Sequence, residues 1–581
     1  MNLKRFKLVG VIFIVALGLV MVRLVDLVLI KGETYLRLAT ANRFYTQDLR
    51  PDRGLILDLA GKPLALNLPN YYFVQKPKSL FSPLTPISRL QALEMLATDS
   101  AQVKKESVRA YPTAEALAQT VGFLRPVTKE DLQARPELKL DDKVGQMGLE
   151  KVFDQRLRGR PGRAVWEVDA LGQKHRLVEK TSPIAGENLK TTLVADLNRQ
   201  AYLAMTGKTG AVVILDAETG AVLGLVSTPS FDPNLFTLKY DDPTQEAHRQ
   251  ASVSAWLQSR KKPFFNRAIA GTYPPGSTFK LVTALAGLES GKLDPEKTVE
   301  DQGILKVGDY QYANWYYRQY GRVEGAISLV RAIARSNDIY FYKAAEWSGP
   351  DVIAQMARQL GLGRKTGIEL LGEATGLVPD PAWKSATLGE KWYLGNTYHF
   401  GIGQGDTLVT PLQLAGMVQT LVAGGKRCQP HLIQQDKNLC SNLELHQDNL
   451  NLILTGMVQA CSDGGTAFPF FEYNRKQLAK LYPEADLKAK LSAGVAACKT
   501  GTAEFGPVLN EAGHRATHGW FVVYLDLSHQ PIKPALAKLA DFSQKIVMVV
   551  LVEADEKNPY KEGSADAAPV AKEILGWILQ S

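Results

Sequence analysis

Cysteine is scarce in the 581-residue sequence, and the cysteines present form no metal-binding or redox-cycling pattern. The four are Cys428, Cys440, Cys461 and Cys498, and none stands in a C-x-x-C spacing. This excludes the common zinc-ribbon and thioredoxin-like motifs. One or two disulfides are possible in an oxidising compartment, but the sequence does not pair the cysteines, and free buried thiols fit it equally well.

Clustered positive charge is also missing, although the chain is basic overall. The net charge is +9 and the isoelectric point is about 9.0, which raises the question of a polyanionic partner. Lys and Arg are spread along the chain, and no zinc-finger spacing, RNA-binding signature or basic repeat occurs. This pattern argues against nucleic-acid binding and favours an exported protein that works near anionic lipid and polymer.

The one long hydrophobic run lies at the N-terminus. Basic residues precede an uncharged stretch from Leu8 to Val22, and apolar character continues to Ile30. About 20 apolar residues cross a bilayer, so residues 8–30 are expected to form a transmembrane helix. The basic flank places residues 1–7 in the cytoplasm and the rest of the chain outside. A cleaved signal peptide is the alternative, but no small-x-small cleavage site follows the run.

Two charges interrupt the end of this run. Arg23 and Asp26 are three residues apart and share one face of a helix. Because charges within a membrane usually face protein, one interpretation is a second helix packed beside them. The alternative is that both side chains reach the outer interface.

The remaining chain predicts an α+β protein. Short β-like runs alternate with polar segments from residue 31 to about 190, which indicates a non-catalytic, β-rich module. From residue 191 onward, strands are expected at both ends of the region, with about 300 mostly helical residues between them. The expected strands are residues 211–215, 221–226, 520–524 and 546–552, and a final amphipathic helix is expected over 567–579.

The strongest chemical signal is the segment of residues 271–280. Pro274, Pro275 and Gly276 cannot lie inside a helix, whereas the residues after Ser277 form a good one. Ser277 is therefore expected at a helix N-terminus, with Lys280 on the same face one turn later. A serine hydroxyl becomes a strong nucleophile when a neighbouring base removes its proton, and a buried lysine with a lowered pKa can be that base.

Two later segments complete a known set of motifs. Ser336-Asn-Asp338 and Lys499-Thr-Gly-Thr502 follow Ser277-x-x-Lys280 in the order found in β-lactamases and penicillin-binding proteins. The chain resembles class B, monofunctional penicillin-binding proteins over essentially its whole length. Further segments carry this resemblance: Arg53–Asp58, Gly145–Glu150, Pro229–Asn234, Gly403–Gly405 and Thr410–Gln413.

Within that class the chain is most similar to the elongation-type enzymes, penicillin-binding protein 2. The similarity rests on Asp338-Ile-Tyr-Phe-Tyr342 and on Lys391-Trp-Tyr-Leu-Gly-Asn-Thr397. It implies a transmembrane helix (8–30), an elongated pedestal (31–190) and a transpeptidase domain (191–581). That domain would hold an antiparallel sheet with helices on both faces and a helical subdomain. The function implied is a peptidoglycan D,D-transpeptidase, sensitive to penicillin, in cell elongation.

The resemblance also implies a role for each site residue. Ser277 would attack the penultimate D-Ala carbonyl of a stem peptide, Lys280 would be the base, and Ser336 would relay the proton. The backbone N–H groups of Ser277 and Thr502 would form the oxyanion hole. The expected catalytic residues are Ser277, Lys280, Ser336 and Lys499, and the expected substrate-binding residues are Asp338, Thr500, Gly501 and Thr502.

Several positions depart from the family's pattern. Asp338 replaces the usual asparagine and cannot donate an amide hydrogen bond. Many elongation-type relatives carry a metal-binding Asp, His and Cys, whereas this chain has Asp301 but Tyr320 and Asn337 at the other two positions, so no metal and no cofactor are predicted. His514 and His518 are expected in a loop, where zinc binding is less expected than solvated or cleft histidines.

The partners implied by the resemblance are stem peptides, β-lactams, the membrane, a membrane glycan polymerase of the shape, elongation, division and sporulation family, and elongation-complex proteins. A polymerase is implied because no glycosyltransferase domain precedes the transpeptidase. Three alternatives stay open: a division (septal) transpeptidase, a β-lactam-binding sensor or β-lactamase, and a catalytically weak scaffold. Intact Ser277, Lys280, Ser336 and Lys499 argue against the scaffold.

Overall fold

The computed structural model describes residues 3–75, 83–98, 102–169, 171–237, 242–435, 439–508 and 515–579. The chain divides into two compact units, and it passes between them more than once. The smaller unit comprises Met1–Gly54, Asn67–Val108 and Gln155–Glu187, and the larger comprises Leu55–Leu66, Arg109–Asp154 and Asn188–Ser581. The boundaries 31–190 and 191–581 stay a prediction.

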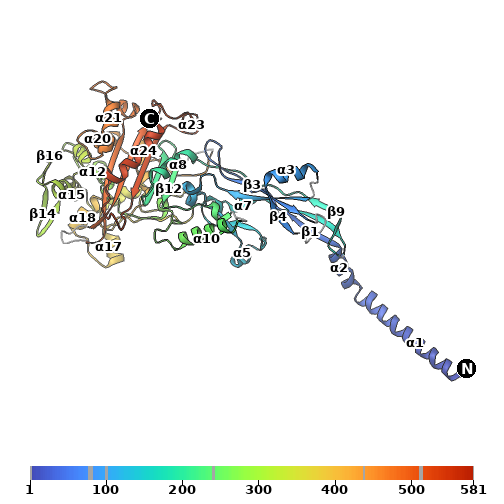
Figure 1. Ribbon diagram of the computed structural model, residues 1–581. Helices are drawn as coiled ribbons and strands as arrows, with labels where there is room; N and C mark the ends of the chain where they lie inside the picture. The colour runs from blue at the N-terminus through green and yellow to red at the C-terminus, as the bar shows by residue number, and fades with distance from the viewer. Residues whose placement is uncertain are drawn as a thin grey trace. The chain divides into compact units, whose positions relative to one another are not determined.

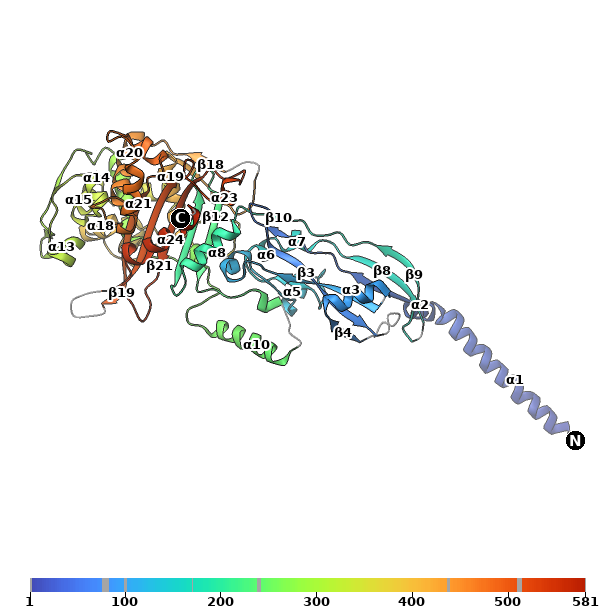
Figure 2. The ribbon, with the colours of Figure 1, turned by 45° about the horizontal axis from the view of Figure 1, so that its top comes forward.

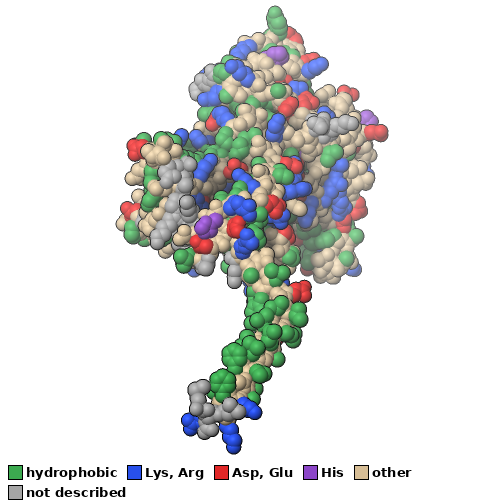
Figure 3. Space-filling view, turned by 90° about the vertical axis from the view of Figure 1, so that its right-hand side faces the viewer, with side chains coloured by type: hydrophobic (Ala, Val, Ile, Leu, Met, Phe, Trp, Pro, Cys, Tyr) green, Lys and Arg blue, Asp and Glu red, His purple; other side chains and the backbone are tan. Residues whose placement is uncertain are grey.

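The smaller unit begins with an exposed apolar helix. Helix α1 (Leu3–Val25) continues through a π-helical turn, η1 (Asp26–Ile30), into α2 (Gly32–Arg43). Residues 4–30 are long and apolar enough to cross a membrane, and none of the most apolar window is buried. In Figure 3 this helix forms an almost continuous hydrophobic surface that ends in basic side chains. Asp26 pairs with Arg23 at 2.7 Å and with Lys31 at 3.0 Å.

The rest of the smaller unit is β-rich, as predicted. Strands β1 (Phe44–Leu49), β8 (Gly162–Val168) and β9 (Lys174–Thr181) form an antiparallel sheet in the order β1-β8-β9. The second half of β3 (Pro63–Val74) pairs with β4 (Leu84–Ile87), which α3 (Arg89–Thr98) and β5 (Val103–Ala110) follow. The labels β1, β4, β9 and α3 locate these elements in Figure 1.

The larger unit is built on a five-stranded antiparallel sheet in the order β12-β11-β21-β20-β19. Its strands are β11 (Gly210–Asp216), β12 (Val222–Thr228), β19 (Ala497–Val508), β20 (Arg515–Asp526) and β21 (Lys545–Val552). The predicted hairpin and both later strands are thus confirmed. Because first and last strands of the region pair in the centre, the predicted α+β organisation is confirmed as well (Figure 2).

Apolar side chains cover one face of this sheet beneath two helices. Val212, Phe521 and Val550 pack in one cluster with α8 (Ala195–Ala204) and α24 (Ala568–Ile578). Helix α24 buries the face that its sequence pattern predicts, which includes Val570, Ile574 and Ile578. Side chains alternate between the two faces of a sheet along a strand. Strand β19 therefore directs Cys498 into this cluster and Lys499 to the opposite face of the sheet.

The mostly helical region contacts the sheet through α19, which packs against β11 and β21, and through α20, which packs against β19. Its helices are η4 (Gly276–Phe279), α12 (Lys280–Glu289), α13 (Trp315–Tyr320), α14 (Leu329–Arg335), α15 (Asp338–Ser348), α16 (Pro350–Gln359), α17 (Pro381–Leu388), α18 (Leu394–Gly401), α19 (Pro411–Val422) and α20 (Gln447–Ala460). Small strand pairs lie among them: β13 (Val299–Asp301) with β16 (Gly325–Ile327), and β14 (Ile304–Val307) with β15 (Tyr310–Ala313).

Shorter elements complete the larger unit. The elements that precede β11 in the sequence are β2 (Ile56–Leu57), η3 (Ala114–Leu117), α4 (Ala118–Val121), β6 (Leu124–Pro126), α5 (Lys129–Ala134), β7 (Lys143–Gly145), α6 (Gly148–Val152) and β10 (Leu189–Lys190). The later ones are α9 (Asn234–Thr237), α10 (Pro243–Gln258), α11 (Arg267–Ala270), η5 (Phe468–Phe470), α21 (Phe471–Leu478), α22 (Leu487–Ser492), α23 (Pro534–Ala537) and η6 (Gly563–Ala567). Helix α7 (Asp154–Arg158) belongs mostly to the smaller unit.

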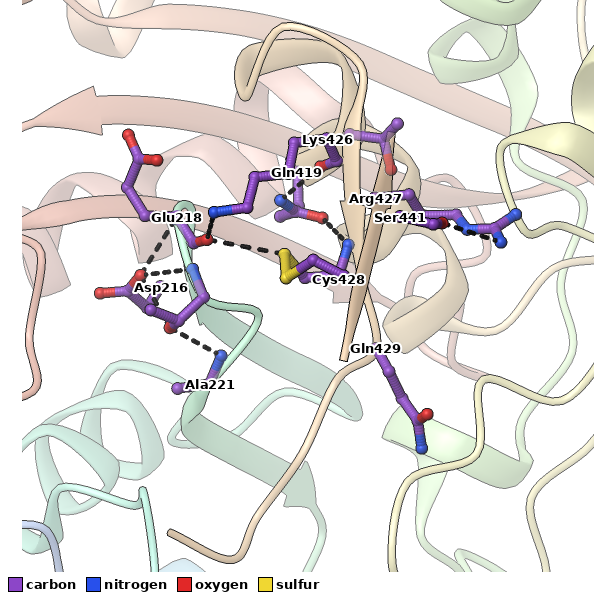
Figure 4. Close-up of a disulfide and its surroundings, with 12 residues drawn as sticks. Asp216, Glu218, Ala221, Gln419, Lys426, Arg427, Cys428, Gln429 and Ser441 are labelled. Carbon is purple, nitrogen blue, oxygen red and sulfur yellow. Dashed lines mark hydrogen bonds between the residues drawn. A yellow bond between two sulfur atoms is a disulfide. The ribbon is translucent and has the colours of Figure 1, made fainter. Parts of the chain in front are cut away.

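All four cysteines form disulfides, a pairing that the sequence left open. Cys428 and Cys440 face each other across the short strands β17 (Lys426–Cys428) and β18 (Cys440–Asn442). Figure 4 shows Cys428 beside the Glu218 carbonyl, which accepts a hydrogen bond from Lys426 Nζ at 2.9 Å. The second disulfide joins Cys461, just after α20, to Cys498 on β19, and both cysteines are fully buried.

Candidate active site

Ser277 lies in a single 3-10 turn that leads directly into α12. The preceding Gly276 has a φ of +54°, and a Cβ there would come within 2.7 Å of the Thr502 carbonyl oxygen on β19. A side chain would push the two elements apart, so glycine allows this close approach. Trp520 Nε1 also donates to the Pro274 carbonyl at 2.9 Å. These contacts hold the half-buried Ser277 against the edge strand β19.

Lys280 is fully buried and is held by the second motif. Its Nζ donates to Asp338 Oδ1 at 2.6 Å and to the Ser336 carbonyl at 2.7 Å, and it lies 3.5 Å from Ser336 Oγ. Burial lowers the pKa of Lys280, although the Asp338 carboxylate opposes this effect. Within the described part of the chain no hydrogen bond joins Lys280 to Ser277. Nζ therefore reaches the second motif and not the nucleophile in this state.

Ser336 occupies a sharp corner between two helices. It follows the last residue of α14 and has a φ of +53°, a left-handed conformation that is uncommon for residues other than glycine. Asn337 then caps α15 by accepting a hydrogen bond from the Tyr340 N–H at 2.8 Å. The corner turns the Ser336 hydroxyl toward Lys280 and Lys499, and such strain is often stored at functional sites.

Lys499 completes a chain of buried polar groups. Its Nζ donates to Ser336 Oγ at 2.7 Å and to the Thr500 carbonyl at 2.9 Å. Burial and the nearby positive charge of Lys280 hold the pKa of Lys499 well below its usual range, against the opposing effect of Asp338. The structure therefore brings Lys280, Ser336 and Lys499 into one hydrogen-bonded group beside Ser277, as the motif order predicts.

Three of the four expected substrate-binding residues, Thr500, Gly501 and Thr502, lie along the same strand, whereas Asp338 begins α15. Thr500 is buried and Thr502 is exposed. A Cβ on Gly501 would come within 2.9 Å of Thr278 Cγ2, so this glycine lets β19 and η4 pack closely. The exposed end of the strand thus lies beside the turn that carries Ser277.

A buried hydrogen-bond network lies behind the second motif, and no sequence motif predicts it. Asp338 accepts from the Trp315 N–H at 2.9 Å, and its own N–H donates to Asn314 Oδ1 at 3.2 Å. The Asn314 and Asn337 amides both donate to Asp301 Oδ2, at 2.7 and 2.6 Å. Asp301 is fully buried. Of these residues, the family resemblance singles out only Asp301, as the position of a metal-binding Asp in relatives.

The contacts of Asp301 bear on the metal prediction. Its oxygens accept hydrogen bonds from two side-chain amides and from the Gly303 and Glu324 N–H groups. Among the described residues there is no group of three or more His, Cys, Asp or Glu placed to hold a metal ion. Donor groups therefore take the place around Asp301 that a cation would need.

His518 lies in strand β20, so the prediction of a loop there is wrong; His514 lies outside the described residues. The Ala554 N–H donates to His518 Nδ1 at 3.1 Å, and the Phe505 ring stacks on the imidazole with centroids 3.9 Å apart. Burial lowers the pKa of His518 to about 4. Nδ1 is thus an acceptor in a neutral ring, which leaves it unsuited to a zinc ligand role.

Acid should destabilise the protein through His518. Its pKa of about 4 in the folded state lies below the ordinary value of 6.5, so the unfolded chain binds more protons between these values. The contribution of His518 to the free energy of unfolding is therefore complete above pH 6.5 and falls by up to about 3 kcal/mol as the pH drops to 4. Urea unfolding across this range should show a weaker pH dependence for His518→Gln. The exposed His529→Gln is the control and should behave like the wild type.

A serine beside a helix start, with two buried lysines and a second serine, defines a class of serine acyl-transfer enzymes. The Penicillin binding protein transpeptidase domain matches residues 210–576, and the Penicillin-binding Protein dimerisation domain matches residues 87–191. The chain therefore belongs to the family of penicillin-binding protein transpeptidases. Its activity is that of a peptidoglycan D,D-transpeptidase of the MrdA, or PBP2, type.

Individual relatives show the extent of the similarity. The peptidoglycan D,D-transpeptidase MrdA of Acinetobacter baumannii is 31% identical over 472 residues, which cover 72% of this chain and 68% of the relative. Pseudomonas aeruginosa PBP2, solved in complex with WCK 5153, is 28% identical with a TM-score of 0.66, over 92% of this chain and 96% of that chain. A chain from a structure on the coordination of polymerization and crosslinking by a peptidoglycan synthase complex is 26% identical with a TM-score of 0.73, over 99% and 98%.

Proposed function

We propose that the transpeptidase acts through an acyl-serine formed on Ser277. The observation that carries this proposal is the hydrogen-bonded group Lys499–Ser336–Lys280, buried beside the turn that carries the serine. Lys280 in its neutral form can take the Ser277 proton, because burial lowers the pKa of Lys280.

The proposed reaction has two steps. Ser277 Oγ attacks the penultimate D-Ala carbonyl of a stem peptide, the C–N bond to terminal D-Ala breaks, and Ser336 passes a proton to the leaving amine. An amine of a neighbouring stem peptide then attacks the acyl-serine and releases Ser277. The N–H groups of Ser277 and Thr502 stabilise the oxyanion in both steps, which is usually the largest contribution in acyl transfer. Thr500, Gly501 and Thr502 line the substrate strand, with Lys499 near the substrate carboxylate.

We also propose that the catalytic unit works on the outer side of the cytoplasmic membrane. The apolar helix of residues 4–30 and its basic N-terminal flank support this orientation. Both disulfides support it further, because disulfides persist in oxidising compartments. We further propose a membrane glycan polymerase as a partner, since a transpeptidase cross-links glycan strands that a polymerase supplies. The similarity to a chain from a peptidoglycan synthase complex supports this partner, and the MrdA, or PBP2, type of the enzyme supports a role in cell elongation.

A labelling time course with the purified full-length protein tests the proposed function. The wild type should bind a fluorescent penicillin covalently and keep the label for many minutes, because deacylation by water is slow in a transpeptidase. Mass analysis should place the adduct on the peptide that contains Ser277. Rapid loss of the label would indicate a β-lactamase, and no label would favour a scaffold. Heat-denatured protein is the control for non-specific labelling.

A further inference from the structure

A short segment between α20 and α21 contacts both the second and the third catalytic motif. We call residues 461–466 the bridge segment. At its start, Cys461 is bonded to Cys498, the residue immediately before Lys499. At its end, the Thr466 hydroxyl lies 2.8 Å from the Thr500 hydroxyl. Since side chains alternate along a strand, Cys498 and Thr500 leave β19 on the same side and Lys499 leaves on the other. The bridge segment therefore holds β19 at the residue before Lys499 and at the residue after it.

The middle of the bridge segment contacts the second motif. Arg335, directly before Ser336, donates from Nη1 to the carbonyls of Gly464 and Gly465, at 3.3 and 3.4 Å. Helix α20 reinforces this connection, because a Cβ on its Gly456 would lie 2.7 Å from Ile333 Cβ on α14. The bridge segment, bonded covalently to Cys498, thus links the strand of Lys499 to the corner of Ser336.

This link acts on the contact that the chemistry uses. Lys499 Nζ and Ser336 Oγ are 2.7 Å apart, and they come from elements 163 residues apart in sequence. The corner at Ser336 directs its hydroxyl toward Lys499, but the position of α14 relative to β19 depends on contacts outside these two elements. The bridge segment supplies such contacts: the disulfide and the Thr466–Thr500 contact attach it to β19, and Arg335 attaches it to α14. Both cysteines are fully buried in a well-packed core.

We propose that the Cys461–Cys498 disulfide and Thr466 position the third motif, so that the enzyme acylates efficiently only after this disulfide has formed. The inference rests on the proposed acyl-serine function. Cys461 and Cys498 act through Lys499, and Thr466 acts through Thr500; they are positioning residues and touch no reacting atom.

Two pairs of double variants test the disulfide. Cys461→Ala/Cys498→Ala should lower the second-order rate constant for acylation by fluorescent penicillin about 10- to 100-fold, because displacements near 1 Å cost about this much. Cys428→Ala/Cys440→Ala removes the other disulfide and should acylate within about twofold of the wild type. Rates are expressed per labelled active site, so that unfolded protein is not counted.

A second arm keeps both disulfides and changes only the hydroxyl contact. Thr466→Val should lower the rate constant about tenfold, and Thr466→Ser should restore it; this arm decides the matter if the cysteine variant fails to fold. Equal rates for Cys461→Ala/Cys498→Ala and wild type, or an equal loss in the control pair, would overturn the proposal. A wild type that takes no label would instead refute the acyl-serine function itself.

Discussion

Lys280→Met is expected to lower the acylation rate constant by about 10²- to 10⁴-fold, the usual contribution of a general base. Methionine fills the space of the lysine stem but cannot take a proton from Ser277. Lys499 is a poor substitute, because its Nζ already donates to Ser336 Oγ and the Thr500 carbonyl. The measurement is the rate of fluorescent-penicillin labelling, followed over time and with excess reagent.

A loss of stability must be separated from this loss of chemistry. Lys280 pairs with Asp338 at 2.6 Å, and removal of one partner from a buried ion pair costs about 3–5 kcal/mol. Lys280→Met/Asp338→Asn removes both charges and should recover much of the stability without recovering the rate. Lys292→Met, three residues beyond the end of α12, is the matched control and should acylate normally. A Lys280→Met rate within about threefold of the wild type would show that another group is the base.

Much of the candidate site could be predicted because each motif is local. Ser277 and Lys280 share one helical turn, and breakers at Pro274 and Pro275 define its start. Ser336 and Lys499 lie far apart in the chain, yet the order of the motifs predicted that they meet. The hairpin of β11 and β12 and the buried face of α24 were predictable for a similar reason, since each depends on a pattern within a few residues.

The contacts that support the motifs could not be predicted, because they join residues with no common pattern. Cys461 and Cys498 are 37 residues apart, and three pairings of four cysteines are possible. Asp301 accepts a hydrogen bond from Asn337, 36 residues later in the sequence, and another from Asn314. The strand pair β14 and β15, which lies between Asp301 and Asn314, has no strong periodicity in its sequence. The prediction of a loop at His518 is wrong because strand β20 begins at Arg515, five residues before the apolar run of residues 520–524.

Asp301→Ala is expected to lower the free energy of unfolding by about 3–5 kcal/mol. The substitution leaves the buried amides of Asn314 and Asn337 and the Gly303 N–H without their acceptor, and each unsatisfied donor costs about 1–3 kcal/mol. The sum is reduced because the groups share one network. Chemical unfolding monitored by tryptophan fluorescence measures the change, with the exposed Asp309→Ala as the control.

The same variant should also slow acylation, by about tenfold or more, because Asn314 orients Asp338 and Asn337 caps α15. A metal role for Asp301 would give a similar loss, so a chelator separates the two explanations. Because Asp301 is already saturated with hydrogen-bond donors, chelation should change neither the stability nor the acylation rate of the wild type. If a chelator reproduced the effects of Asp301→Ala, a bound cation and not the two asparagines would organise the second motif.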